Sequence, residues 1–275
     1  MHNSKNLSIV SYIIINLLLI CFLWVIFTSC DRKTQPLKIL AIGNSFTEGA
    51  TDKYLVPLAK ENGDSLIIFS LILGTSDLET HWNNIQTDAH VYNFKFIYED
   101  SIIFNYNSSI LFALQYQDWD YIVIQQLSSK CGLYETYYPY IELIKQYLQY
   151  NALNNKVKIV FHQTWAYDQN STHGGFAKYD KNQITMYNAI TTTVERVCNE
   201  MNIKTIIPSG TAIQNARGKL GDIFCRDGYH VNDLGSYVLA CTWFEIFYNE
   251  DCFNTTIRPK TAISDENLYS SSVGT

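Results

Sequence analysis

Five short apolar runs, separated by segments of helical length, limit most strongly how this 275-residue chain can fold. The runs are rich in Ile, Leu and Val and are short enough for strands buried on both faces. They are 37–43, 65–74, 118–126, 155–165 and 203–210, with helices expected at about 51–62, 76–89, 135–150, 179–201 and from about Asn232. Strands that alternate with helices form βαβ units, whose parallel sheet is covered on both faces. We therefore predict a three-layer α/β/α fold around a central parallel sheet of about five strands.

Residues 92–107 break this alternation. The stretch YNFKFIYEDSIIFNYN contains two alternating runs on either side of Glu99-Asp100. Alternation with a period of two is typical of strands, and two such runs joined by a short turn predict a β-hairpin. We interpret the hairpin as a small insertion, followed by a short helix at 108–117.

The first thirty residues differ in composition from the rest. Residues 8–27 carry no charge, and this length could span a bilayer. A polar start, an apolar centre and the FTSC that follows also fit a secretion signal. Cys30 directly follows Thr28-Ser29, as the lipid-modified cysteine follows small residues in a bacterial lipobox, although Phe27 matches the lipobox poorly. We predict a lipoprotein-type signal or anchor over residues 1–30, with a retained N-terminal anchor as the alternative. Either one exports the rest of the chain and tethers it to a membrane.

The remainder divides into a linker at 31–36, one domain at 37–250 and a C-terminal tail at 251–275. This length suits a single α/β domain. The net charge of −6 argues against a nucleic-acid partner, because phosphate binding needs a basic face. The cysteines after position 30 form no CxxC pair and no metal-ligand spacing, so we expect no metal and no cofactor. These cysteines are Cys131, Cys198, Cys225, Cys241 and Cys252, of which Cys225 could pair with Cys241 or Cys252.

Polar residues follow the ends of successive predicted strands, and ligands of such sheets bind beyond the carboxyl ends of the strands. Ser45 is the second residue after the first predicted strand. A serine is nucleophilic only when a base accepts its proton, and a serine in this position also commonly caps a helix. Asp227 precedes His230 by three residues at the start of the last helix, so that the carboxylate could orient the imidazole. Asp222 and Asp233 are also near His230 in the sequence and stay open as its partner.

An acyl-transfer site also needs hydrogen-bond donors where the oxyanion forms. The N–H of Ser45 is a candidate, because the first turn of a helix has unpaired N–H groups. The N–H of Gly74, at the end of the second strand, is another. Gln125 and Gln126 end the third predicted strand, and only one is expected to enter the site, because adjacent strand residues point to opposite faces. Bracing of the backbone is the alternative for both glutamines.

Aromatic residues are abundant, with 20 Tyr and 5 Trp. Tyr and Trp combine a flat apolar face with a polar tip, which suits sugar binding, but core packing is the common alternative. Trp82, Trp165 and Tyr167 follow strands or adjoin them, and we predict that they wall the acyl or sugar pocket together with Asn44. His81 and His162 are interpreted as structural.

Three stretches carry a resemblance to one family. IGNSFTEGA resembles the first conserved block of the SGNH (GDSL-like) hydrolases, with Gly43-Asn44-Ser45 where that family usually has Gly-Asp-Ser. LILGTSDLETHW is similar to the second block, and DGYHVNDLGSYVLA resembles the last. The resemblance implies a flavodoxin-like fold, a branch of exported Gram-negative bacterial proteins located in the periplasm or at the cell surface, and a catalytic triad. It makes Ser45 the nucleophile, His230 the general base and acid, and Asp227 the residue that orients His230.

The chain departs from the family at the third block. That block is usually Gly-x-Asn-Asp, whose Asn completes the oxyanion hole, whereas this chain has QQLSS. Gln125 or Gln126 is expected to replace the Asn beside the N–H groups of Ser45 and Gly74, with Ser129 as a further candidate. The resemblance predicts a serine esterase that removes small acyl groups, such as acetyl, from carbohydrate through an acyl-enzyme. A glycan-binding lipoprotein without turnover, built on the same scaffold, is the alternative, and a sugar acyltransferase is a third.

Overall fold

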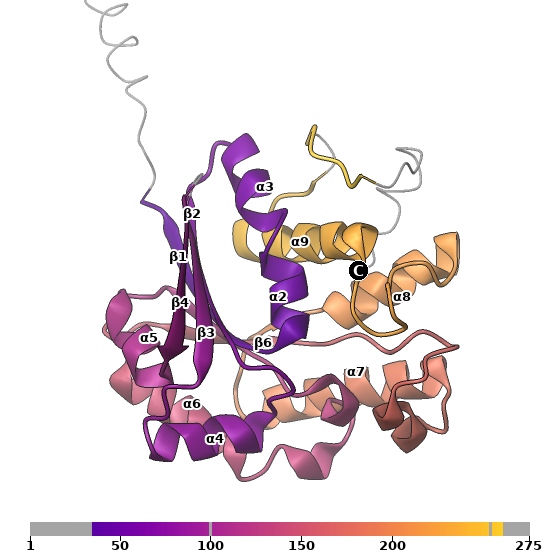
Figure 1. Cartoon of the computed structure of the whole chain (residues 1–275), viewed down its shortest axis with the longest axis horizontal. Helices are drawn as coiled ribbons and strands as arrows, with labels where there is room; N and C mark the ends of the chain where they lie inside the picture. Colours follow the sequence, from indigo (N-terminus) through magenta and orange to yellow (C-terminus); the bar gives the residue numbers. More distant parts are fainter. Residues whose placement is uncertain (1–34, 99–100, 253–254, 261–275) are drawn as a thin grey trace, which may run out of the picture. The chain divides into compact units, whose positions relative to one another are not determined.

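A seven-stranded sheet, in the order β4-β3-β2-β1-β5-β6-β7, organises the domain (Figure 1). The computed structural model describes residues 35–98, 101–252 and 255–260. The parallel strands are β1 (Leu37–Gly43), β2 (Leu66–Ile72), β5 (Tyr121–Ile124), β6 (Lys158–His162) and β7 (Thr205–Ile207). The predicted α/β fold with a mainly parallel sheet is confirmed, and each parallel strand lies within one of the five apolar runs.

The prediction of about five strands is too low, because the hairpin belongs to the sheet. β3 (Tyr92–Tyr98) pairs antiparallel with β2, and β4 (Ser101–Ser108) pairs antiparallel with β3. Phe94 of β3 stacks on Phe69 of β2 with ring centroids 4.3 Å apart. This packing of Phe94 on Phe69 stabilises β3 as an extension of the sheet. β4, at the open edge, is exposed along nearly its whole length.

Helices cover the sheet on both faces (Figure 1). On one face, α2 (Ser45–Thr51) and α3 (Leu55–Glu61) pack against α9 (Asp233–Tyr248), which also contacts α8 (Ser209–Leu220). α4 (Leu78–Gln86), α5 (Ile110–Tyr116) and α6 (Tyr140–Asn151) contact one another on the other face, and α7 (Gln183–Glu200) packs against α8. Short 3-10 helices occur at Ser128–Lys130, Tyr134–Thr136 and Gly174–Tyr179.

Two helices differ from the sequence prediction. The helix expected at 51–62 is two helices, and the first begins at Ser45 because Asn44 caps it. α8 was not expected at all. Its sequence, SGTAIQNARGKL, contains two glycines and little apolar periodicity, so the sequence gives little sign of it.

The described residues contain no helix long and apolar enough to cross a membrane. The predicted signal or anchor at 1–30, with Cys30, lies outside the described residues. Cys225, Cys241 and Cys252 are free thiols, so neither of the two pairings that the sequence left open is formed. Of the predicted tail, residues 255–260 contact α3 and α9 through Glu61 and Asp233.

Candidate active site

The turn from β1 into α2 holds Ser45 at the carboxyl end of the central strand. The side chain of Asn44 accepts a hydrogen bond from the N–H of Phe46 (3.0 Å) and thereby caps the helix. Ser45 is the first helical residue and is partly exposed. Only glycine fits at position 43, because a Cβ there would lie 2.2 Å from Oγ1 of Thr47. Asn44, not Ser45, is therefore the cap, and the Ser45 hydroxyl is left for other contacts.

The side chains of Asn44 and Gln125 brace this turn from the interior of the protein. Nδ2 of Asn44 donates to the carbonyl of Ser76 (3.0 Å), and Oδ1 of Asn44 accepts from Nε2 of Gln125 (2.8 Å). Oε1 of Gln125 accepts from the hydroxyl of Thr47 (2.5 Å). Asn44 and Gln125 are each only 1% exposed. Their amides are thus engaged inside the protein, an arrangement that favours a bracing role over substrate or oxyanion binding.

The side chain of Gln126 is also hydrogen-bonded inside the protein, but to other residues than that of Gln125. Its Nε2 donates to the carbonyl (3.0 Å) and hydroxyl (3.1 Å) of Thr136, and its Oε1 accepts from the N–H of Leu78 (3.1 Å). It therefore ties the end of β5 to the start of α4. Ser129 is 7% exposed and packs against Gly175. Neither glutamine turns its amide toward Ser45, which agrees with the bracing alternative considered from the sequence.

His230 and Asp227 reach Ser45 from the other end of the chain. Oγ of Ser45 lies 2.9 Å from Nε2 of His230, across a separation of 185 residues. Nδ1 of His230 lies 2.7 Å from Oδ2 of Asp227. The other two candidate aspartates are engaged elsewhere, Asp222 with Arg217 and Asp233 with Lys53. The structure thus brings together the three side chains predicted as a triad.

The Asp227 carboxylate is held by its own loop. Its Oδ1 accepts hydrogen bonds from the N–H groups of Tyr229 (3.2 Å) and His230 (2.7 Å). Burial acts to raise the pKa of Asp227, but the hydrogen bonds from His230 and Tyr229 outweigh it and hold the pKa below its usual value. Asp227 is therefore ionised at neutral pH. An ionised carboxylate at Nδ1 keeps the proton there and leaves Nε2 to accept the Ser45 proton.

The backbone N–H groups of Ser45 and Gly74, predicted as oxyanion donors, follow the ends of the paired strands β1 and β2. The N–H of Leu73 donates to the carbonyl of Gly43 (3.0 Å), which joins the turn after β2 to the turn after β1. Gly74 follows at an exposed position, with nothing within 4 Å of where a Cβ would lie. Among the described residues, neither the N–H of Ser45 nor that of Gly74 has a hydrogen-bond acceptor. Both are thus available to an oxygen of a ligand.

The predicted aromatic walls lie mostly in the interior. Trp165 is 0% exposed, stacks on Phe46 and donates from Nε1 to the carbonyl of Tyr229 (2.8 Å). Tyr167 is also 0% exposed, with its hydroxyl 2.8 Å from Oγ of Ser128. Trp82 is partly buried on α4. Trp165 and Tyr167 therefore support the site from behind and cannot present a ring face to a ligand without movement.

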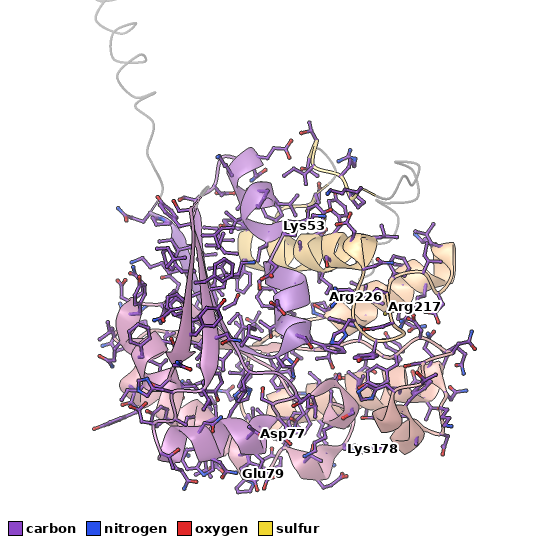
Figure 2. All side chains as sticks on the ribbon, in the orientation of Figure 1. Lys53, Asp77, Glu79, Lys178, Arg217 and Arg226 are labelled. Atoms are coloured by element: carbon purple, nitrogen blue, oxygen red, sulfur yellow. The ribbon has the colours of Figure 1, made fainter. Side chains whose placement is uncertain are left out.

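Arg217, labelled in Figure 2, lies on α8 and fastens the loop that carries Asp227 and His230. Its side chain is 3% exposed and donates to Oδ1 of Asp168 (2.6 Å) and to the carbonyl of Ala166 (2.9 Å). Its Nε lies 2.7 Å from Oδ1 of Asp222, an ion pair by distance without hydrogen-bond geometry. The N–H of Asp168 in turn donates to the carbonyl of Gly228 (2.8 Å). This clamp was not predictable from the sequence, because nothing in the local sequence marks a long-range ion pair.

His81 and His162 lie inside the protein. Nδ1 of His81 lies 2.9 Å from the hydroxyl oxygen of Tyr92, and Nε2 of His162 lies 2.9 Å from Oγ of Ser209. Burial lowers the pKa of His81 to about 4 and that of His162 to about 3, so both are neutral. Within the described part of the chain, no group of three His, Cys, Asp or Glu side chains is arranged to hold a metal ion.

Solved structures similar to this chain fall into two groups. A DUF4886 family protein from Bacteroides uniformis is 36% identical, covers 86% of this chain and 94% of its own, and superimposes with a TM-score of 0.83. A putative SGNH hydrolase from Slackia heliotrinireducens is 17% identical over 77% of this chain and 99% of its own, with a TM-score of 0.53. An acetylxylan esterase from Geobacillus stearothermophilus is 12% identical over 78% and 95%, with a TM-score of 0.51.

The second group shares the fold alone, which is the fold of the SGNH (GDSL-like) hydrolases predicted from the sequence. A comparison with curated proteins finds no match. The sequence model of the domain of unknown function DUF4886 matches residues 38–272, nearly the whole described domain. On this match and on the Bacteroides structure, the chain belongs to the DUF4886 family.

Proposed function

We propose that this protein is a serine esterase that removes small acyl groups, acetyl above all, from carbohydrate esters. The observation that carries the proposal is the continuous chain of hydrogen bonds from Ser45 through His230 to Asp227, at the carboxyl end of β1. The same side chains at these distances support nucleophilic catalysis by serine on several unrelated folds. The choice of an acetylated sugar rests on the fold shared with an acetylxylan esterase.

The proposed reaction uses these three side chains in turn. His230 takes the hydroxyl proton as Oγ of Ser45 attacks the ester carbonyl, and Asp227 stabilises the imidazolium that forms. The tetrahedral intermediate collapses when His230 gives that proton to the leaving alcohol, which leaves an acyl-enzyme on Ser45. Water then attacks the acyl-enzyme with His230 as the base. The acid is released and the Ser45 hydroxyl is restored.

The oxyanion of each intermediate would be held by the N–H groups of Ser45 and Gly74. Gln125 and Gln126 would not contribute to it, since the amides of both are hydrogen-bonded in the interior. Removal of one oxyanion donor typically costs a factor of about 10²–10³ in kcat. We therefore expect a slower enzyme than relatives whose Asn side chain completes the hole.

We further propose that the enzyme acts outside the cytoplasm, tethered by residues 1–30 through Cys30 or an uncleaved helix. The apolar, uncharged stretch at 8–27 supports this location. The substrate would then be a surface or extracellular glycan ester.

The test is hydrolysis of p-nitrophenyl acetate by the wild-type protein and by Ser45→Ala, with circular dichroism to check the fold. We expect Ser45→Ala to lose turnover by about 10⁴-fold or more. A fluorophosphonate probe should label the wild type and not the variant. Equal turnover by the two proteins would contradict the mechanism.

A glycan-binding protein without turnover is the second candidate function. The observation that favours it is that Gln125 and Gln126, the two predicted side-chain donors of the oxyanion site, are hydrogen-bonded inside the protein instead. It predicts no labelling of Ser45 by the fluorophosphonate together with binding of the glycan.

A further inference from the structure

A row of rings continues outward from the imidazole of His230. The ring of Tyr229 lies 4.2 Å from that of His230, centroid to centroid, and 4.6 Å from that of His173. The last ring of the row is that of Tyr167, in the interior of the protein, with its centroid 4.7 Å from that of His173. Tyr229 and His173, which we name the aromatic shelf, are partly exposed, unlike Tyr167.

The backbone fixes Tyr229 to the triad. Its N–H donates to Asp227 (3.2 Å) and its carbonyl accepts from Trp165 (2.8 Å). Tyr229 also directly precedes His230 in the chain. A ligand packed on this ring would therefore lie beside the ester-cleaving groups in a fixed position.

His173 is held in one orientation by a local cap. Its Nδ1 accepts a hydrogen bond from the N–H of Gly175 (3.0 Å), which leaves Nε2 to carry the proton of the neutral ring. Burial lowers the pKa of His173, and the charges of His230 and Lys178 lower it further against the opposing effect of Asp227. His173 thus presents a neutral N–H donor at neutral pH.

The hydroxyl of Tyr229 and Nε2 of His173 are the polar tips of the shelf. Among the described residues, no hydrogen bond reaches the hydroxyl of Tyr229 or Nε2 of His173. Neither atom is one of the buried polar atoms left without a partner, so both contact solvent. An oriented aromatic surface with two free polar tips is complementary to a ring that has an apolar face and hydroxyls at its edge.

We propose that the aromatic shelf is a sugar subsite, in which the pyranose ring carrying the ester packs on Tyr229 and accepts a hydrogen bond from Nε2 of His173. The subsite rests on the proposed function, since it places the sugar ester at Ser45. It takes the role predicted for Trp165 and Tyr167, which are buried.

The first experiment measures selectivity between a sugar ester and an ester without a ring. The substrates are methyl tetra-O-acetyl-β-D-glucopyranoside and ethyl acetate, and the readout is the ratio of their kcat/KM values in a pH-stat. Tyr229→Ala should lower this ratio about tenfold, and Tyr229→Phe, which keeps the ring, should lower it far less. The control is Tyr150→Ala, which removes an 88% exposed tyrosine on α6 and should leave the ratio at the wild-type value. An unchanged ratio in Tyr229→Ala would overturn the proposal.

A matched pair of variants separates the two roles of His173. His173→Asn keeps an acceptor where Nδ1 meets the N–H of Gly175 but lacks the outer donor. His173→Gln carries an amide near the place of Nε2 but loses the cap. The proposal expects His173→Asn to raise KM for the sugar ester about fivefold and His173→Gln to stay closer to the wild type. The opposite order, or no change of KM in either variant, would show that His173 only caps the 3-10 helix and does not bind the sugar.

If the protein hydrolyses neither ester, the esterase proposal is refuted, but the sugar subsite is not. The subsite is then tested by measuring ligand binding. Ser45→Ala and the double variant Ser45→Ala/Tyr229→Ala are titrated with the acetylated glucoside by calorimetry. Binding by the first protein that weakens about tenfold in the second supports the shelf. Equal binding by both, or binding by neither, overturns it.

Discussion

The two halves of the site are held in different ways. Ser45 lies on a turn braced by uncharged side chains, and two of them, Asn44 and Gln125, are each 1% exposed. His230 and Asp227 lie on the 221–232 loop, with side chains 22% and 38% exposed, and a charged residue, Arg217, fastens that loop. The bracing of the nucleophile is part of the core of the sheet, whereas the base depends on an ion pair outside the sheet.

This contrast predicts how each half of the site should respond to the loss of a stabilising side chain. Loss of a brace under Ser45 affects the ends of β1, β2 and β5 at once, so that stability and activity should decline together. Loss of the Arg217 clamp should release the loop while the sheet persists, because proteins open locally where few contacts hold a segment.

Arg217→Met should give the largest effect. Removal of one partner from a buried ion pair costs about 3–5 kcal/mol, because Asp168 and Asp222 are left without their cation. Hydrogen exchange should accelerate in residues 221–232 and stay slow in β1, and hydrolysis should be lost with the loop.

The matched control is Arg196→Met, which removes an exposed ion pair with Glu200 on α7. Water and salt screen such an exposed pair, so its loss should change the free energy of unfolding far less than the loss of Arg217. Equal unfolding free energies for the two variants in urea, or faster exchange in β1 than in the loop, would break the comparison.

Asn44→Ala should give a smaller effect on stability, about 2–3 kcal/mol. The variant loses a helix cap and leaves the buried carbonyl of Ser76 and the amide of Gln125 unpaired. Asn182→Ala is the matched control, since Asn182 caps α7 through the N–H of Thr185 in an exposed position and should cost only about 1 kcal/mol. Thermal unfolding and ester hydrolysis should both decline in Asn44→Ala. Full stability with lost activity would mean that Asn44 acts on the substrate and not on the fold.

The sequence predicted the parts of this molecule that depend on local pattern. Parallel strands buried on both faces are continuous apolar runs, so β1, β2, β5, β6 and β7 were each located. The residues of the candidate triad were found because a serine after a strand and an Asp-x-x-His before a helix are short-range signals.

Features that depend on distant contacts were not predictable in the same way. The hairpin joins the sheet through packing of Phe94 on Phe69, and Arg217 meets Asp168 across 49 residues. Whether an aromatic ring is exposed is likewise decided by its neighbours in space, so Trp165 was placed in the pocket and is buried. Tyr229 was within reach of sequence reasoning, because it lies inside the motif that identified His230.

The smallest expected effect is a difference in pH dependence between the two halves. The pKa of Asp227 is held below its usual value in the folded protein, so folding favours the ionised carboxylate. This stabilisation is complete above the pKa of the unfolded carboxyl, about 3.9, and is lost as the pH falls through the lower pKa of the folded state. Because the side chain is 38% exposed, the stabilisation should stay below about 1 kcal/mol.

Asp227→Asn should therefore be slightly less stable than the wild type at pH 7, and the gap should close in acid as the wild-type carboxyl becomes protonated. The gap between Asn44→Ala and the wild type should persist over the same range, because no charged group takes part in the bracing of Asn44. Urea unfolding of the three proteins from pH 7 down to about pH 2, well below the usual pKa of an aspartate, measures both gaps. A gap for Asn44→Ala that also closed in acid would show that the turn carrying Ser45 depends on a charge, and the two halves would then be held in the same way.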